Sequence, residues 1–383
     1  MTRQMATNKF GLYVHIPFCV SKCSYCDFAS IPANQKTIND YTKALCKEIS
    51  MHKAAFSNDV FDTVFIGGGT PSCIPQDNLE QIISSIYDNF ALDISEFTVE
   101  INPGTGDIRL FEMMKKLGVS RASVGLQCAN DSVLQTIGRI HTTAQFEETI
   151  EMIKHAGIDN FSADIITGLP DETADDVIKS ISLVHQLGAK HISMYTLKLE
   201  DGTPLKHDVE IGKVQLPTDE EEYEMSFAAR KYLSKLGYMR YEISNFAQQG
   251  YESRHNLKYW QRLPYLGIGV AAASMYGNAR YLNTSSIKNY VEQIDLNKLP
   301  LVEKTDLSNE EIAFEMIMLS TRLAEGMKYS DYNSFTGNNF AEKYSDILSE
   351  LEEQRLIIPS ATHFRLSQSG MDIQNTILLK FMD

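Results

Sequence analysis

Three cysteines lie within eight residues near the start of the chain, Cys19, Cys23 and Cys26, with the spacing C-x3-C-x2-C. Three thiols cannot all pair in disulfides, and structural zinc normally takes four ligands, whereas no further ligand pair lies nearby in the sequence. Three closely spaced thiolates suit three irons of a [4Fe–4S] cluster, whose fourth iron stays open for a small chelating ligand. The spacing therefore predicts an iron–sulfur site. We interpret the scattered remaining cysteines as small buried or half-buried residues: Cys46, Cys73 and Cys128.

Polar residues follow several strand-like runs, where they could hold such a ligand. The stretch Gly67-Gly68-Gly69-Thr70-Pro71 follows one apolar run, and Glu100 and Gln127 end two others. Glycines let a backbone approach a ligand closely. Asp164 lies inside an otherwise apolar run, where a buried charge must be paired or hydrogen-bonded. The alternatives to ligand binding are a tight turn at the glycines, a solvated charge at Glu100 and a structural pairing of Arg139 with Asp164.

Helix-like and strand-like segments alternate over the first 245 residues. Four amphipathic segments that each end at a glycine predict helices: 107–117, 143–156, 173–187 and 218–236. Apolar runs predict strands: 11–16, 63–66, 97–101, 122–126, 161–167, 191–197 and 238–244. This alternation is typical of parallel βα units, either in an open doubly wound sheet or in a full or partial barrel. In each arrangement we expect the chemistry in the loops after the strands.

Beyond residue 245 the pattern changes. Segment 251–280 is rich in Gly, Tyr and Ala and predicts irregular structure, whereas 308–323 predicts a helix. A further helix over 344–354, a hairpin with strands 356–358 and 364–366, and a final helix are typical of a small α+β domain of winged-helix type. We therefore divide the chain into three parts: 1–245, 246–300 and 301–383.

The chain has 383 residues and a formal charge of −15, from 35 Lys+Arg and 50 Asp+Glu. This acidic balance argues against nucleic acid or an anionic membrane surface as the main partner, because like charges repel. No apolar run approaches the length of a bilayer span, and the first nine residues lack the apolar core of a signal peptide. We therefore expect a cytoplasmic protein.

With Tyr25 before its last cysteine, the C-x3-C-x2-C loop resembles the signature of radical S-adenosylmethionine (SAM) enzymes. In that family the open iron chelates the amino and carboxylate groups of SAM, and one electron from the cluster cleaves SAM to a 5′-deoxyadenosyl radical. Gly68–Pro71 resembles the family's GGTP motif. From Tyr13 to Pro170 the sequence resembles the branch that contains oxygen-independent coproporphyrinogen III oxidases and HemW-type haem chaperones, which implies a partial (β/α)6 barrel.

The resemblance also implies which residues form the site. The implied cluster ligands are Cys19, Cys23 and Cys26. The implied contacts with SAM come from Tyr13, Tyr25, Gly68, Gly69, Thr70, Glu100, Gln127, Arg139 and Asp164.

Several features distinguish the chaperones from the oxidases. The oxidases have a longer N-terminal extension, and they carry a fourth cysteine two residues after the last ligand, where this chain has Phe28. The stretch from His255 to Trp260 resembles the chaperones' HNxxYW motif and implies haem contact by His255, Tyr259 and Trp260, since imidazole ligates haem iron well. Taken alone, His255 would be a hydrogen-bonded loop histidine. Ala273 departs from the family pattern, which usually has a histidine there.

We therefore expect a haem chaperone that binds haem, a [4Fe–4S] cluster and SAM, and that transfers haem to acceptor apoproteins such as respiratory haem proteins. It would take electrons from a donor to the cluster and could associate peripherally with a membrane during haem delivery. The alternative is the oxygen-independent coproporphyrinogen III oxidase, which decarboxylates two propionates. A third is a radical SAM enzyme with another substrate. We expect no coproporphyrinogen oxidase activity, and whether the protein catalyses another reaction stays open.

Overall fold

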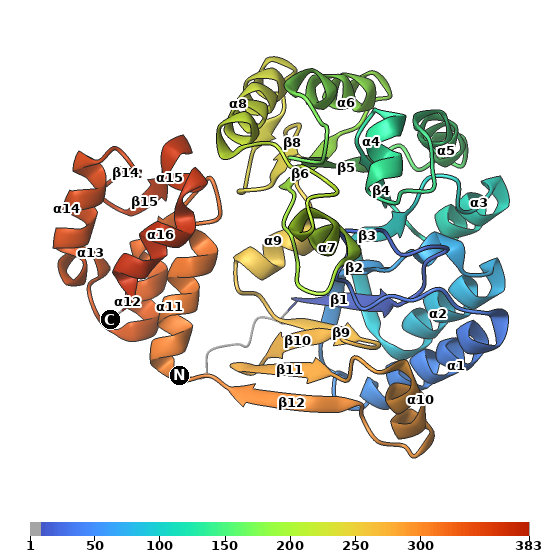
Figure 1. Ribbon diagram of the computed structural model, residues 1–383. Coiled ribbons are helices and arrows are strands. Elements are labelled where there is room, and N and C mark those ends of the chain that lie inside the picture. The colour runs from blue at the N-terminus through green and yellow to red at the C-terminus, as the bar shows by residue number, and fades with distance from the viewer. Residues whose placement is uncertain (1–8, 383) are drawn as a thin grey trace.

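The computed structural model describes residues 9–382 and shows a curved sheet with helices on its outer side (Figure 1). Six parallel strands form its centre in chain order: β1 (Lys9–Ile16), β2 (Val60–Gly68), β3 (Ala91–Ile101), β4 (Arg121–Gln127), β5 (Phe161–Thr167) and β6 (His191–Thr196). The 12-stranded sheet ends at β12 (Leu301–Asp306) on one side and at β7 (Met239–Arg240) on the other, so the barrel stays open. The predicted α/β fold with a partial (β/α)6 barrel is confirmed.

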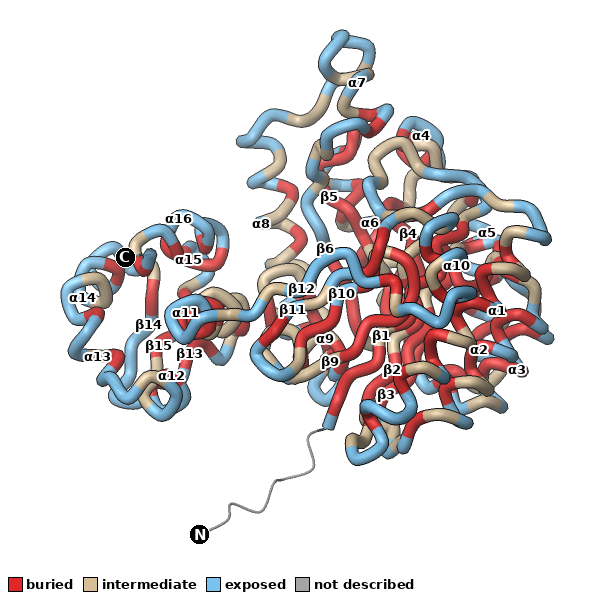
Figure 2. Tube along the Cα trace, turned by 90° about the horizontal axis from the view of Figure 1, so that it is seen from below, coloured by how far each residue is buried: buried red, intermediate tan, exposed pale blue. Residues whose placement is uncertain are grey.

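Helices follow the strands and cover the outer face: α1 (Gln35–His52), α2 (Gln76–Asn89), α3 (Ile108–Lys116), α4 (Asp131–Thr136), α5 (Thr143–His155), α6 (Ala174–Gln186) and α8 (Asp219–Lys235). The four predicted helices agree with α3, α5, α6 and α8 to within one residue at each end. Capping boxes at Thr142, Thr173 and Thr218 start three of them. The strands are buried between these helices and the barrel interior (Figure 2). No helix within residues 9–382 is long and apolar enough to cross a membrane.

The predicted strand 238–244 is wrong. The chain there forms only the short β7, then turns, and returns as β8 (Asn245–Ala247), which pairs antiparallel with both β7 and β6. Glu242 is fully buried in the turn, and its carboxylate accepts hydrogen bonds from Ser244 N and Asn245 Nδ2. This buried carboxylate makes a turn more stable than a continued strand.

The predicted irregular structure over 251–280 is also wrong. The segment contains α9 (Arg254–Trp260), β9 (Tyr265–Ile268) and β10 (Ala273–Tyr276), and β11 (Ala279–Asn283), α10 (Ile287–Asp295) and β12 follow. β9 pairs in parallel with β1, and β10, β11 and β12 extend the sheet antiparallel from it. Strands of four or five residues are too short to show a periodicity, and β9 pairs with β1, which lies about 250 residues away in the sequence.

A small α+β domain forms the C-terminal part of the chain, as predicted. It begins with α11 (Asn309–Ser320) and contains an antiparallel sheet in the order β13 (Met327–Lys328), β15 (His363–Leu366), β14 (Ile357–Pro359). The predicted hairpin is β14 and β15. Further helices are α12 (Tyr329–Thr336), α13 (Phe340–Lys343), α14 (Ser345–Glu353), α15 (Gln368–Asp372) and α16 (Gln374–Leu378). Its core is separate from that of the barrel. β12 follows the predicted boundary at residue 300 but pairs within the large sheet of the barrel. The division at 245 and 300 stays a prediction.

Candidate functional site

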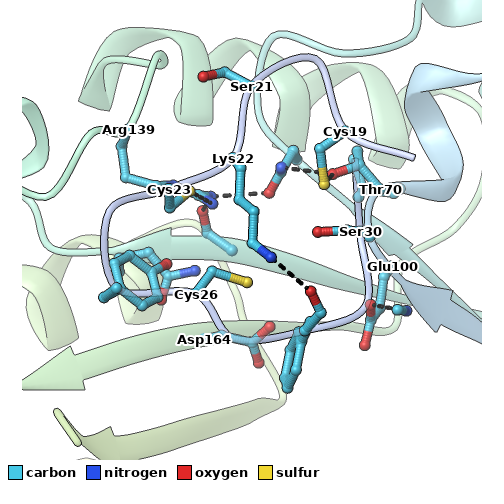
Figure 3. Close-up of a pocket in the computed structure, with 18 of the residues that line it drawn as sticks. Cys19, Ser21, Lys22, Cys23, Cys26, Ser30, Thr70, Glu100, Arg139 and Asp164 are labelled. Carbon is cyan, nitrogen blue, oxygen red and sulfur yellow. Dashed lines mark hydrogen bonds between the residues drawn. The ribbon is translucent and has the colours of Figure 1, made fainter. Parts of the chain in front are cut away.

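A pocket of about 140 Å³ lies at the carboxyl ends of β1 to β5 (Figure 3). Parallel α/β folds carry their chemistry at this end of the strands, as predicted. The pocket lining contains eleven of the twelve residues expected to hold the cluster and SAM: Cys19, Cys23, Tyr25, Cys26, Gly68, Gly69, Thr70, Glu100, Gln127, Arg139 and Asp164. Residues from segments far apart in the sequence therefore meet in one place.

The cysteine loop between β1 and α1 is held on two sides. Cys19 N donates to Ile31 O at 3.1 Å, which closes the loop on itself. Ser24 N donates to Ile137 O at 3.1 Å, and Leu205 N donates to Ser24 O at 2.8 Å. Leu205 belongs to α7 (Pro204–Glu210), which Figure 1 shows in front of the barrel opening. The backbone that carries the three thiols is thus fixed by neighbours on both sides.

Two of the three thiols accept hydrogen bonds from the pocket wall. Thr70 Oγ1 donates to Cys19 Sγ and Arg139 Nη1 donates to Cys23 Sγ, both at 3.5 Å. These contacts hold Cys19 and Cys23 against the wall of the pocket. Within residues 9–382, no three His, Cys, Asp or Glu side chains converge on one metal-ion position. A [4Fe–4S] cluster takes each thiolate on a different iron, so this donor set fits a cluster and not a single ion.

Arg139 donates hydrogen bonds near the carboxyl ends of β3 and β4 and does not pair with Asp164. Its Nη2 donates to Asn102 Oδ1 at 2.9 Å and to Gly125 O at 2.8 Å. Asp164 instead accepts weak hydrogen bonds from Ser123 Oγ, at 3.4 and 3.5 Å. The structural pairing considered from the sequence is therefore not formed. Sequence reasoning missed Asn102, although it lies two residues after Glu100 and hence on the same face of the strand end.

Two half-buried carboxylates, Glu100 and Asp164, face the pocket from β3 and β5. Glu100 Oε2 accepts a hydrogen bond from Gly68 N at 2.9 Å. Burial and then the nearby Asp164 raise the pKa of Glu100 to about 7. Burial also raises the pKa of Asp164. Two carboxylates this close favour a bound cation or hydroxyl group, which the ammonium and ribose groups of SAM would provide.

The glycine loop approaches its neighbours too closely for any side chain. A Cβ at Gly67 would lie 2.7 Å from Glu100 Cδ, and one at Gly69 would lie 2.5 Å from Phe18 O. Gly68 has φ of 110°, which side chains rarely permit. The loop is therefore packed closely against Glu100 and Phe18 beside the pocket, and its contact with SAM stays a prediction.

Tyr13 is the one expected SAM residue that does not line the pocket. Its hydroxyl shares a hydrogen bond with His15 Nδ1 at 2.9 Å, and His15 Nε2 bonds Ala29 O at 2.9 Å in the cysteine loop. Burial lowers the pKa of His15, so the ring is neutral at pH 7. Tyr13 therefore supports the loop through His15. Sequence reasoning gave His15 no role because it forms no ligand-spaced pair.

Comparison with known proteins gives the family. The radical SAM superfamily model matches residues 13–184, and the HemN C-terminal domain model matches residues 307–373. Two proteins named "Heme chaperone HemW" align over almost the whole chain. The one from Lactococcus lactis is 31% identical over 371 residues (97% of this chain, 96% of the relative), and the one from Bacillus subtilis is 32% identical over 374 residues (97% and 98%). The chain belongs to the HemW family.

The fold is shared with a solved structure of a related enzyme. The coproporphyrinogen III oxidase HemN from Escherichia coli superposes with a TM-score of 0.86, over 98% of this chain and 90% of the enzyme, at 21% identity. At this identity the likeness concerns the fold. Phe28 follows the last cysteine and is 61% exposed at the pocket rim.

The motif that resembles HNxxYW of the HemW family lies on α9, and its histidine is fully buried. Thr63 Oγ1 bonds His255 Nδ1 at 2.9 Å, and Tyr259 Oη bonds His255 Nε2 at 2.8 Å. The ring stacks on Phe65 with centroids 5.4 Å apart. Burial lowers the pKa of His255 to about 3. With both nitrogens engaged, His255 has none free for iron in this conformation, and the alternative of a hydrogen-bonded structural histidine describes it better than haem contact.

The other two residues of the HemW-type motif differ in their surroundings. The Tyr259 ring packs edge-on against Tyr265 with centroids 4.6 Å apart, so Tyr259 also belongs to the structural support of α9. Trp260 lies at the end of α9, where the guanidinium of Arg322 from the C-terminal domain lies 4.3 Å from its ring. Trp260 also lines a cleft beside that domain. Of the three residues predicted to contact haem, Trp260 is the one that borders open space.

Proposed function

We propose that this protein is a haem chaperone that binds haem and delivers it to acceptor apoproteins. The observation that carries the proposal is the match over nearly the full length of the chain to proteins named heme chaperone. Phe28, in place of the oxidases' fourth cysteine, supports the chaperone over the oxidase. Respiratory haem proteins are the proposed acceptors. The proposed place of action is the cytoplasm, with peripheral contact to a membrane during delivery.

In this proposal the pocket at the carboxyl ends of the strands holds two cofactors. Cys19, Cys23 and Cys26 would bind a [4Fe–4S] cluster, which needs an electron donor. The glycine loop would present backbone groups to SAM, and Glu100 and Asp164 would accept hydrogen bonds from it. When bound, the cluster and SAM supply one-electron chemistry. Arg139 keeps Cys23 and the end of β4 together while they bind.

The proposal is tested by haem transfer. The protein is reconstituted with iron and sulfide without oxygen, loaded with haem, and mixed with the haem-free form of a respiratory haem protein. We expect the acceptor's haem spectrum and activity to appear faster than with free haem at the same concentration. If the protein binds no haem, or if transfer is no faster than from free haem, the proposal fails.

The second candidate is the oxygen-independent coproporphyrinogen III oxidase. The cluster and SAM residues gathered in one pocket favour it, because the oxidase reaction would use the one-electron chemistry that a cluster and SAM supply. Reconstituted protein is incubated with coproporphyrinogen III, SAM and a reductant, and carbon dioxide and the decarboxylated product are measured. Turnover would establish the second candidate. We expect no product.

A further inference from the structure

A cleft of about 440 Å³ separates the end of α9 from the C-terminal domain. On the domain side, α11 lines it with Ile312, Met316 and Ser320, whose spacing of four residues places them on one helix face. On the barrel side lie Trp260 and Arg262. Figure 1 shows α9 on the side of the barrel that faces this domain. The cleft is therefore a gap between the two cores, bordered by the HNxxYW helix.

The wall of this cleft suits a flat, mostly apolar ligand. Leu323, Met327 and Phe335 add to the apolar surface from α11 and to the ring of Trp260. The volume lies within the range of about 300–1,000 Å³ that is typical of small-molecule sites. The side chain of Met316 is half-buried, and a thioether is one of the axial ligands that proteins use for haem iron.

Two side chains in the lining carry N–H groups that lack an acceptor. Within residues 9–382, Trp260 Nε1 and Arg262 Nη2 are buried and have no hydrogen-bond partner. Arg262 uses only its Nε, which donates to Glu315 Oε2 at 2.9 Å. Buried donors without partners are rare and costly, so each calls for an explanation. Both atoms are closed to solvent in this conformation, so a carboxylate of a bound ligand would supply the missing acceptor once the side chain of Arg262 or Trp260 turned toward the cleft.

The charges around the cleft distinguish it from a second cleft, of about 540 Å³, on the opposite side of α11. The lining of the second cleft has three carboxylates and one guanidinium: Glu303, Glu311, Glu315 and Arg280. The lining of the first cleft is balanced: Arg262 and Lys328 against Glu325 and Asp331. A ligand with two carboxylates is repelled less by the first cleft than by the second.

We propose that the cleft between α9 and α11 binds haem, with the porphyrin against Trp260 and the apolar wall, a propionate on Arg262 and Met316 as an axial ligand of the iron. This assignment rests on the proposed haem-binding function. It moves the haem site from His255 to the outer end of the same helix, where a bound haem would contact both the barrel and the C-terminal domain.

The test fills one cleft or the other. Ser320→Trp places a bulky ring in the proposed haem cleft, and Met318→Trp places the same ring in the second cleft, across the helix. Haem is titrated into the full-length wild type and both variants, and its Soret absorbance gives the Kd. We expect Ser320→Trp to raise the Kd about tenfold or more, equivalent to about 1.4 kcal/mol. Met318→Trp should bind as wild type does. Circular dichroism and the Tm establish that each variant is folded.

A second pair of variants tests the iron ligand without filling the cleft. Met316→Ala should change the axial-ligand spectrum of bound haem, and His255→Asn should leave that spectrum unchanged. If wild type binds haem but Ser320→Trp binds equally well and Met316→Ala keeps its spectrum, the cleft is not the site. If only His255→Asn loses the axial-ligand spectrum of bound haem, His255 and not Met316 binds the iron. If wild type binds no haem at all, the proposed function itself fails, and the inference with it.

Discussion

Two kinds of acidic group share the pocket, namely the thiols of the cysteine loop and the carboxylates of Glu100 and Asp164. Cys19 and Cys23 each accept a hydrogen bond, from Thr70 Oγ1 and Arg139 Nη1. Glu100, next to Asp164, instead has its pKa raised by burial. At the scale of single residues, two thiols are therefore held by fixed donors, whereas Glu100 is prepared to bind a cation or a proton.

The first prediction concerns the cluster ligands. Cys23→Ala should abolish binding of the [4Fe–4S] cluster, because three thiolates are needed for three irons. Iron and sulfide analysis after anaerobic reconstitution, together with the thiolate-to-iron absorbance, measures the effect. Cys46→Ala, in α1 and outside the pocket, is the matched control and should keep the cluster. Four irons per chain in Cys23→Ala would reject this ligand set.

The second prediction concerns Glu100, whose pKa in the folded protein is raised from 4.5 to about 7. Between these two values the folded state holds a proton that the unfolded state has lost, so the contribution of Glu100 to stability falls as the pH rises and is lost above about pH 7. Glu100→Gln cannot titrate and should lack this slope. Urea unfolding of wild type and Glu100→Gln from pH 4.5 to 8, without cofactors, measures the difference. Parallel profiles would show that Glu100 has an ordinary pKa.

At the scale of elements, α9 is a seven-residue helix that depends on the barrel for its stability. Glu96 on β3 is buried and accepts hydrogen bonds from Arg254 N at 2.9 Å and from His255 N at 3.0 Å. Thr63 on β2 holds the ring of His255 from inside the barrel. The helix is therefore fixed at its first turn, while its other end borders the cleft.

The third prediction tests this support. Glu96→Ala removes the acceptor of the buried N–H of His255 and the part-buried N–H of Arg254, and an unsatisfied buried group costs about 1–3 kcal/mol. We expect the free energy of unfolding to fall by at least about 2 kcal/mol. Chemical denaturation measures it, with Glu80→Ala on exposed α2 surface as control. An unchanged stability would mean that α9 does not depend on Glu96.

At the scale of the whole molecule, ion pairs join the barrel and the C-terminal domain, both around α11 and at Asp372, which pairs with Arg230 and Arg240. Glu315 is buried and bonds Arg262 at 2.9 Å and Arg280 at 2.6 Å. Arg322 bonds the buried Glu242 at 3.2 Å. Because Arg262 and Arg280 come from the barrel side, Glu315 helps to fix the position of the C-terminal domain beside the cleft.

The fourth prediction is that Glu315→Ala loosens this junction. Two arginines would lose their shared partner, at a cost of about 1–3 kcal/mol. We expect faster protease cleavage between β12 and α11, and a lower free energy of unfolding. Glu310→Ala, on the exposed first turn of α11, should behave as wild type does. Equal cleavage rates for the two variants would exclude Glu315 as the link between the parts.

Most of the barrel and the pocket could be predicted from the sequence, because those signals are local or carried by motifs. Glycine stops and capping residues mark the ends of α3, α5, α6 and α8. Motif residues at the strand ends converge because parallel strands bring their carboxyl ends to one edge. Of the strands after residue 245, the hairpin of β14 and β15 could be predicted, whereas β9 to β12 could not, because this short group joins the barrel through the pairing of β9 with the distant β1.

The sequence by itself determined the family and the residues of the pocket, since closely spaced thiols and a glycine loop have few other chemical uses. Only the tertiary structure decided what His255 does. Its burial, and the acceptors and donors around its ring, depend on Thr63 and Phe65, which lie about 190 residues away in the sequence. The cleft beside Trp260 likewise exists only because two separately packed cores meet there, and no local pattern encodes the space between them.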